Sequence, residues 1–344
     1  TDPVAEAPEV QEPVVPDLAN VSLGILWEQK FGDAVSSSPL VLSDRIVVGC
    51  RDGHVYAMDP ADGARIWAYA AGDGFGSSPA AAGDVVVIGG YDGKIYALDA
   101  ATGAERWSVA TGGRIVASPA AAENLVLAGS YDRQLYALNA ADGAVRWKKD
   151  LGAVIWASPA VSGDRVVVAD LGGKVTALQL ANGSVVWQSR VGGEIYASPD
   201  VGEGKVYVGA GTNLIALNLS DGAVAWTVPA GSKANGSPRY HEGRVIAGTD
   251  GGAIFAVDAA LGQKVWEAAT GGAVKARPVF YERTVWVPSY DGYLHGIEWM
   301  TGAPGAKINL DTTVFSSPSV RDGNAYFGGM DGRFFAVRLG LATP

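Results

Sequence analysis

The sequence repeats one pattern about every 40 residues, and this repeat limits the folds open to it. Each copy contains a Pro, usually after Ser, then an apolar run, a Gly-containing turn, a second apolar run and usually a Trp. Residues 91–99 read YDGKIYALD, and residues 131–139 read YDRQLYALN. The Pro recurs at Pro39, Pro79, Pro119, Pro159, Pro199, Pro238, Pro278 and Pro318. A period near 40 with four strand-like segments is typical of a β-propeller blade.

Each copy divides into four strands, as at residues 78–81, 85–88, 95–98 and 104–109. We name them A to D in chain order. Asp and Gly between strands B and C fit a tight hairpin, because both tolerate positive φ. We place these turns at Asp52-Gly53, Asp92-Gly93, Asp132-Arg133, Gly172-Gly173, Gly211-Thr212, Asp250-Gly251, Asp291-Gly292 and Asp331-Gly332. We interpret the repeated Asp as a turn residue. The alternative is a ring of carboxylates that binds cations or a basic partner.

The two ends of the repeat complement each other. The last copy, residues 313–339, ends after strand C, whereas residues 23–31 contain only a strand D with Trp27. The N-terminal strand therefore completes the last blade, which removes the open edges of the array. The sequence predicts an all-β, eight-bladed propeller of four-stranded antiparallel blades as one domain over residues 21–340. We interpret the recurring Trp as a large side chain that packs on the next blade.

The first 20 residues differ from the repeat. They are rich in Pro, Glu, Ala and Val, with five acidic residues and no Lys or Arg, which predicts an extended acidic linker. It is a spacer, or a tether from a membrane anchor ahead of Thr1. The net charge of −10 opposes a nucleic-acid partner. No apolar run approaches the ~18 residues of a membrane helix, so membrane attachment is expected only through such an anchor.

Residues for catalysis or metal binding do not form a recognisable set. Cys50 is the single cysteine and follows an apolar run, which predicts a buried thiol. His54, His241 and His295 are too scattered for a metal cluster. The serines before Pro recur in nearly every blade, as a structural role requires. We therefore predict no catalytic, cofactor-binding or metal-binding residues and no cofactor.

The motif Asp-Gly-Lys-Ile-Tyr-Ala-Leu-Asp, followed by Thr-Gly and Trp107, resembles the repeat of quinoprotein (pyrroloquinoline-quinone-type) propellers over nearly all of residues 23–339. Within that group the chain is most similar to the B-lipoprotein family of the outer-membrane β-barrel assembly machinery. The resemblance implies a periplasmic scaffold that docks on the barrel-assembly protein through loops on one face. That family's docking residues cannot be assigned, because no Leu-Arg pair precedes Pro159 or Pro199.

Functional residues are expected where the repeat departs from its average. The position three residues before each Pro enters strand A and varies widely in side chain. Its larger and more polar members are candidates for contact with a partner, since exposed aromatics anchor interfaces: Trp156, Tyr196, Asn235, Lys275 and Phe315. The alternative is that the large side chains plug the central channel.

Blade 7 departs most from the repeat. Arg277 replaces the Ser before Pro278, and Ala306 replaces the strand D Trp. Trp299 stands instead in the turn between strands C and D. It either folds back to fill the gap, which we expect, or is exposed for a partner. Arg277 and Trp299 are therefore further candidates for partner contact.

Taken together, the sequence predicts a non-enzymatic, monomeric scaffold of the cell envelope, periplasmic or otherwise extracytoplasmic. It would dock a protein partner, in outer-membrane protein assembly, through the face that carries the D–A loops and B–C turns. Two alternatives remain open. One is a quinone- or small-ligand-binding propeller similar to quinone-dependent dehydrogenases, and the other is an extracytoplasmic sensor domain.

Overall fold

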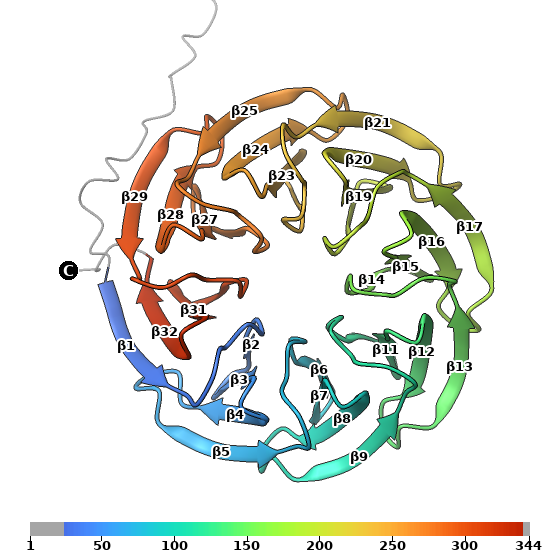
Figure 1. The fold of residues 1–344 in the computed structure, drawn as a ribbon, viewed down its shortest axis with the longest axis vertical. Helices are drawn as coiled ribbons and strands as arrows, with labels where there is room; N and C mark the ends of the chain where they lie inside the picture. Colours follow the sequence, from blue (N-terminus) through green and yellow to red (C-terminus); the bar gives the residue numbers. More distant parts are fainter. Residues whose placement is uncertain (1–23, 340–344) are drawn as a thin grey trace, which may run out of the picture.

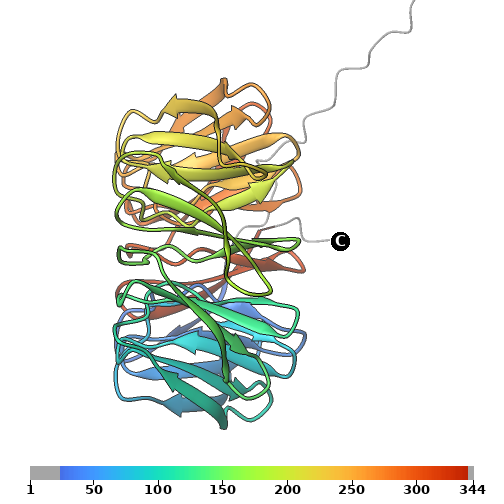
Figure 2. The same ribbon diagram turned by 90° about the vertical axis from the view of Figure 1, so that its right-hand side faces the viewer.

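The protein forms a closed ring of eight antiparallel sheets around a central channel, as the computed structural model shows for residues 24–339 (Figure 1). Each sheet has four strands, and every regular element in this range is a strand. Figure 2 shows the ring from the side as a short cylinder of upright blades. Among these residues, no helix is long and apolar enough to cross a membrane. The predicted eight-bladed propeller is confirmed; residues 1–20, the predicted linker, lie outside the described range.

Strand order follows the chain outward from the channel. The innermost strands A are β2 (Leu40–Val41), β6 (Ala80–Ala82), β10 (Ala120–Ala122), β14 (Ala160–Ser162), β18 (Asp200–Gly202), β22 (Arg239–His241), β26 (Val279–Tyr281) and β30 (Ser319–Arg321). Strands B are β3 (Ile46–Gly49), β7 (Val85–Gly89), β11 (Leu125–Gly129), β15 (Arg165–Ala169), β19 (Lys205–Ala210), β23 (Arg244–Gly248), β27 (Thr284–Pro288) and β31 (Asn324–Gly328).

Strands C and D complete each blade toward the rim. Strands C are β4 (His54–Met58), β8 (Lys94–Asp99), β12 (Gln134–Asn139), β16 (Lys174–Gln179), β20 (Asn213–Asn218), β24 (Ala253–Asp258), β28 (Tyr293–Glu298) and β32 (Arg333–Arg338). Strands D are β5 (Arg65–Ala70), β9 (Glu105–Ala110), β13 (Val145–Asp150), β17 (Val185–Arg190), β21 (Val224–Pro229), β25 (Lys264–Ala269), β29 (Pro304–Asn309) and, for the eighth blade, β1 (Gly24–Lys30).

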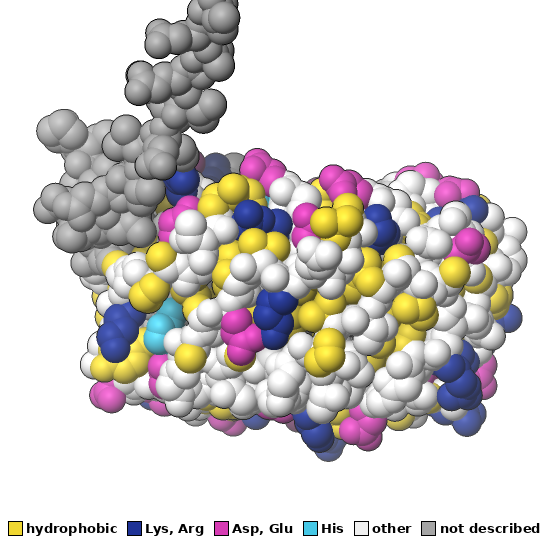
Figure 3. Space-filling view, turned by 90° about the horizontal axis from the view of Figure 1, so that it is seen from above, with side chains coloured by type: hydrophobic (Ala, Val, Ile, Leu, Met, Phe, Trp, Pro, Cys, Tyr) yellow, Lys and Arg dark blue, Asp and Glu magenta, His cyan; other side chains and the backbone are white. Residues whose placement is uncertain are grey.

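Burial explains the residue types along each blade. Strand β7 is buried along its whole length, because neighbouring blades cover both faces of its sheet, and strands of this kind read as continuous apolar runs. The outer strand β9 instead alternates, with Trp107 buried between exposed neighbours. Figure 3 shows the rim near β21 and β25, where apolar side chains are interspersed with charges of both signs. The core is thus a set of clusters between blades.

The ring closes through its two ends. Strand β1 pairs antiparallel with β32, with Gln29 opposite Phe334, and gives the sheet order β1-β32-β31-β30. In Figure 1 the blue β1 lies beside the red β32. The N-terminal strand therefore completes the eighth blade, as the sequence predicted.

Each strand D Trp joins its blade to the next. The Trp107 indole donates a hydrogen bond to the Ala140 carbonyl at 2.9 Å and covers Gly143. A Cβ at Gly143 would lie 2.8 Å from that ring, and the residue has a φ of 73°. Only glycine adopts this positive φ without strain and also leaves room for the indole ring. Equivalent indole hydrogen bonds to the next blade are made by Trp27, Trp67, Trp147, Trp187, Trp226 and Trp266.

Blade 7 replaces this contact in a way that the sequence reading missed. Trp286 on strand β27 lies opposite Gly296, where a Cβ would be 2.8 Å from its ring. It is 3% exposed and packs in the cluster between blades 7 and 8, beside Ala306. The expectation that Trp299 folds back to fill this gap is therefore wrong. A buried Trp on strand B, with glycine opposite, fills the space.

Trp299 packs at a different blade interface. Its ring centroid lies 5.3 Å from that of His241, edge to face, and the Arg244 guanidinium lies 5.3 Å from the Trp299 ring centroid. Phe280 also contacts it edge to face. The side chain is half-buried, and Trp299 covers the junction of blades 6 and 7.

Removing one interblade indole should measurably weaken the ring. We expect Trp107→Ala to lower the free energy of unfolding by about 3–5 kcal/mol, through lost packing and the cavity left behind. Val145→Ala is the matched control, because Val145 is an exposed apolar residue of the adjacent strand D. Thermal and urea unfolding followed by circular dichroism checks this. Equal stability of the two variants would contradict the role given to the indole.

Candidate functional site

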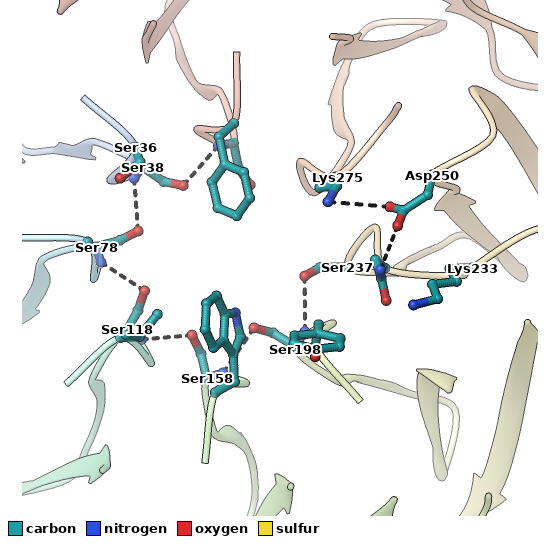
Figure 4. Close-up of a pocket in the computed structure, with 17 residues that line it drawn as sticks. Ser36, Ser38, Ser78, Ser118, Ser158, Ser198, Lys233, Ser237, Asp250 and Lys275 are labelled. Atoms are coloured by element: carbon teal, nitrogen blue, oxygen red, sulfur yellow. Dashed lines mark hydrogen bonds and ion pairs between the residues drawn. The ribbon is translucent and has the colours of Figure 1, made fainter. Parts of the chain in front are cut away.

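The central channel opens on both faces of the propeller. The upper cavity lies among the D–A loops and B–C turns, has a volume of about 440 Å³, and is lined by Trp156, Tyr196, Asn235, Lys275 and Phe315, among others. The lower opening, with a volume of about 830 Å³, is lined by the strands A, including Leu40, Arg239, His241, Arg277 and Phe280. The same serines line both spaces, so they form the waist of the channel (Figure 4).

The serines before Pro are connected from blade to blade. The backbone N–H of Ser38 donates to the Ser78 Oγ at 2.9 Å, and the Ser78 N–H donates to the Ser118 Oγ at 2.9 Å. The same bond continues through Ser158, Ser198 and Ser237, and Ser317 closes it onto Ser38. We name these residues the serine ring. It satisfies backbone donors at the channel wall, which gives the repeated Ser a structural role.

Arg277 interrupts the serine ring. Its backbone N–H still donates to the Ser317 Oγ at 2.8 Å, but its side chain offers no oxygen to Ser237. The guanidinium instead donates to the Pro238 carbonyl at 3.2 Å and pairs with Asp200 at 2.6 Å. Desolvation in the channel lowers the pKa of Arg277, and the Asp200 charge opposes this. Arg277 thus connects blades 5 and 7 below the waist, outside the upper cavity.

Aromatic residues form one wall of the upper cavity. Trp156 and Tyr196 meet edge to face with centroids 5.6 Å apart, and Tyr131 lies 5.9 Å from Trp156. The Tyr196 hydroxyl donates to Glu194 at 3.2 Å. Trp156, Tyr196 and Phe315 are each half-buried. Their rings are therefore held by neighbours and still present a face to the cavity.

Polar residues from blades 6 and 7 form the opposite wall. Asn235 donates to the Asp250 carboxylate at 2.8 Å, and the Lys275 ammonium lies 3.7 Å from the other Asp250 oxygen (Figure 4). Lys275 also lies 5.6 Å from the ring centroid of Tyr290. Burial raises the pKa of Tyr290, and the Asp250 charge adds to this. Lys233 is exposed at the rim of this wall.

The repeated Asp residues stabilise the B–C turns, because their carboxylates accept hydrogen bonds from the same hairpin. Asp132 accepts the N–H of Gln134 at 2.9 Å and the hydroxyl of Tyr136 at 2.7 Å. Burial raises the pKa of Asp132, but these hydrogen bonds outweigh it and the net pKa is lowered. The same N–H contact two residues on is made by Asp52, Asp92, Asp291 and Asp331.

Asp250 does not belong to this set, so its predicted place in the turn ring is wrong. The positive-φ glycine of its turn is Gly252, not Gly251, which puts Asp250 one residue earlier and into the upper cavity. The signal was present in the sequence, since residues 250–258 align with residues 91–99 and match Asp250 to Tyr91. Asp250 and Lys233 are the cavity residues that sequence reasoning missed.

The remaining reactive side chains lie apart from the upper cavity. Cys50 is fully buried, as predicted, and burial raises the pKa of its thiol to about 12. His295 contacts the turn residue Asp291 at 2.9 Å. Among residues 24–339, no three His, Cys, Asp or Glu side chains come together closely enough to hold a metal ion.

The structure brings five of the seven predicted contact residues together. Trp156, Tyr196, Asn235, Lys275 and Phe315 all line the upper cavity, although they come from five different D–A loops. Arg277 lines the lower opening, and Trp299 packs on His241 and Phe280 between blades 6 and 7, so these two do not join that surface.

The family described as "Outer membrane protein assembly factor BamB" matches residues 22–74, 51–194 and 189–340, which together span nearly the whole chain. The chain belongs to this family. A curated relative, the outer membrane protein assembly factor BamB of Yersinia pestis, is 31% identical over 97 residues, 27% of this chain and 25% of the relative. The matched segment thus spans about a quarter of that relative.

Solved structures support the same fold. The crystal structure of BamB from Moraxella catarrhalis aligns with a TM-score of 0.80 at 22% identity, covering 92% of this chain and 99% of that one. The quinohemoprotein alcohol dehydrogenase from Comamonas testosteroni aligns with a TM-score of 0.77 at 15% identity, covering 96% of this chain and 78% of that one. At these identities the likeness shows the propeller fold, which scaffolds and dehydrogenases share.

Proposed function

We propose that this protein is a non-enzymatic, monomeric scaffold of the extracytoplasmic cell envelope that docks a protein partner in outer-membrane protein assembly. The upper cavity is the docking site in this proposal. The observation that carries it is the convergence of Trp156, Tyr196, Phe315, Asn235 and Lys275 on one opening. The relatives' names as outer membrane protein assembly factors support the process. The partner is then a component of that machinery, for which we take the barrel-assembly protein.

The cavity has the composition of an interface anchor. Energetically dominant interface residues are enriched in Trp, Tyr and Arg and lie near the centre of the contact. Trp156 and Tyr196 are fixed by contact with each other and with Tyr131, so little side-chain entropy is lost when a partner covers them. The serine ring below them holds the loops on a rigid base.

Several polar side chains of the cavity have a polar partner within the protein. Asp250 is bound by Asn235 and faces Lys275, and Tyr196 is bound to Glu194. A nucleophile is activated by an adjacent general base, a lowered pKa or a bound metal ion. The contacts of this cavity instead fix the shape and charge of a surface. The geometry therefore favours recognition over covalent chemistry.

Docking is tested with the purified barrel-assembly protein from the same genome. We expect Trp156→Ala with Tyr196→Ala to weaken its binding by at least tenfold, of the order expected when two central aromatic anchors are removed. Surface plasmon resonance on the full chain measures this. Val145→Ala with Val224→Ala, on the outer rim, is the control and should bind as the wild type does. Unchanged affinity of the aromatic double variant, with a normal thermal melt, would contradict this docking site.

The absence of quinone chemistry is tested separately. A ligand present at about 100 times its Kd stabilises the folded state by about 2.7 kcal/mol, so a bound quinone would raise the melting temperature. We expect no shift with pyrroloquinoline quinone and calcium, measured by differential scanning fluorimetry. An apo quinoprotein dehydrogenase serves as the positive control. A saturable rise in melting temperature would overturn the non-enzymatic assignment.

A further inference from the structure

We propose that the lower opening of the channel binds a small organic anion that carries an aromatic or apolar group. This site lies below the serine ring, on the face opposite the proposed docking surface. It is lined on one side by Arg239, His241, Arg277 and Phe280. The proposal does not rest on the docking function.

The charge of this opening has the opposite sign to that of the chain. Its titratable lining residues are two arginines and one histidine, with no Asp or Glu among them, whereas the chain carries a net charge of −10. Two carboxylates lie beside these residues. Asp200 is bound to Arg277 at 2.6 Å and accepts the Tyr240 N–H at 2.7 Å, and Glu242 lies 4.0 Å from His241. Arg239 therefore remains as an uncompensated positive charge.

Arg239 is free to bind a ligand. Within residues 24–339 its guanidinium makes no hydrogen bond or ion pair, and the side chain is exposed. Arg277 lines the same opening but is already paired with Asp200, so Arg239 is the guanidinium available to an anion. Carboxylate, sulfonate and phosphate groups match the planar donors of Arg.

The rest of the wall supplies an apolar surface. Leu40, Val41, Val279 and Phe280 line the same opening. Phe280 is held by stacking on His241, with centroids 3.9 Å apart. A volume of about 830 Å³ lies within the ~300–1,000 Å³ typical of small-molecule sites. The opening thus combines the positive charge of Arg239 with an apolar wall that an aromatic or apolar group can contact.

The fold does not require Arg239. The equivalent first residue of the other strands A is small, apolar or acidic: Leu40, Ala80, Ala120, Ala160, Asp200, Val279 and Ser319. An exposed arginine at the first position of only one of the eight strands A indicates a role outside folding.

The test uses isothermal titration calorimetry of the full chain with naphthalene-1-sulfonate. The neutral naphthalene-1-sulfonamide has nearly the same shape and is the ligand control. We expect the sulfonate to bind with one-to-one stoichiometry, the sulfonamide to bind at least tenfold more weakly, and added salt to weaken the sulfonate further. No heat of binding from the sulfonate at millimolar concentration, or equal affinity for the two ligands, would overturn the proposal.

Variants locate the binding. Arg239→Gln should lower the sulfonate affinity about tenfold or more, as for loss of a hydrogen bond between charged groups, and Arg239→Lys should retain part of it. Lys275→Gln removes a cation from the upper cavity of the same channel and should leave the affinity unchanged. Wild-type affinity of Arg239→Gln, or a loss in Lys275→Gln as large as that in Arg239→Gln, would place the anion elsewhere. Circular dichroism verifies that each variant is folded.

Discussion

The packing of each blade on the next holds this ring together. A single four-stranded sheet leaves both faces of its apolar inner strands uncovered, and the ring covers them only when it is closed. The strand D indoles make this contact specific, since Trp107 both covers Gly143 and donates to the Ala140 carbonyl. The pairing of β1 with β32 extends the same packing across the chain ends.

In a closed ring of repeated blades, only some positions can differ in residue type from one blade to another. The inner strands and the serine ring use the same contacts in blade after blade, so they build the scaffold and carry little information about a ligand. The D–A loops and the first residues of the strands A face the channel and are free to differ. Trp156, Lys275, Arg239 and Arg277 all occupy such positions. The two ends of the channel thereby acquire different chemistry on one framework.

The fold was predictable from the sequence because the repeat of about 40 residues remains recognisable when single residues depart from it. The site was predictable only in part. D–A loop residues were found by counting from each Pro, but Asp250 was misplaced by one residue because its turn carries two glycines. In blade 7, Trp286 on strand B replaces the missing strand D Trp. This replacement could be recognised only from the strand pairing, which places Trp286 opposite Gly296. The Arg277–Asp200 pair joins blades that are not neighbours, and no spacing rule reveals such a contact.

We propose that function lies in the D–A loops of the upper face, whose residues differ from blade to blade. Hydrogen–deuterium exchange of the full chain, with and without the barrel-assembly protein, tests it most directly because it reports every loop at once. We expect slower exchange in the D–A loops around Trp156, Tyr196, Asn235 and Lys275, and no change in the outer strands D. Slower exchange confined to the strands D, or to the lower face, would contradict it.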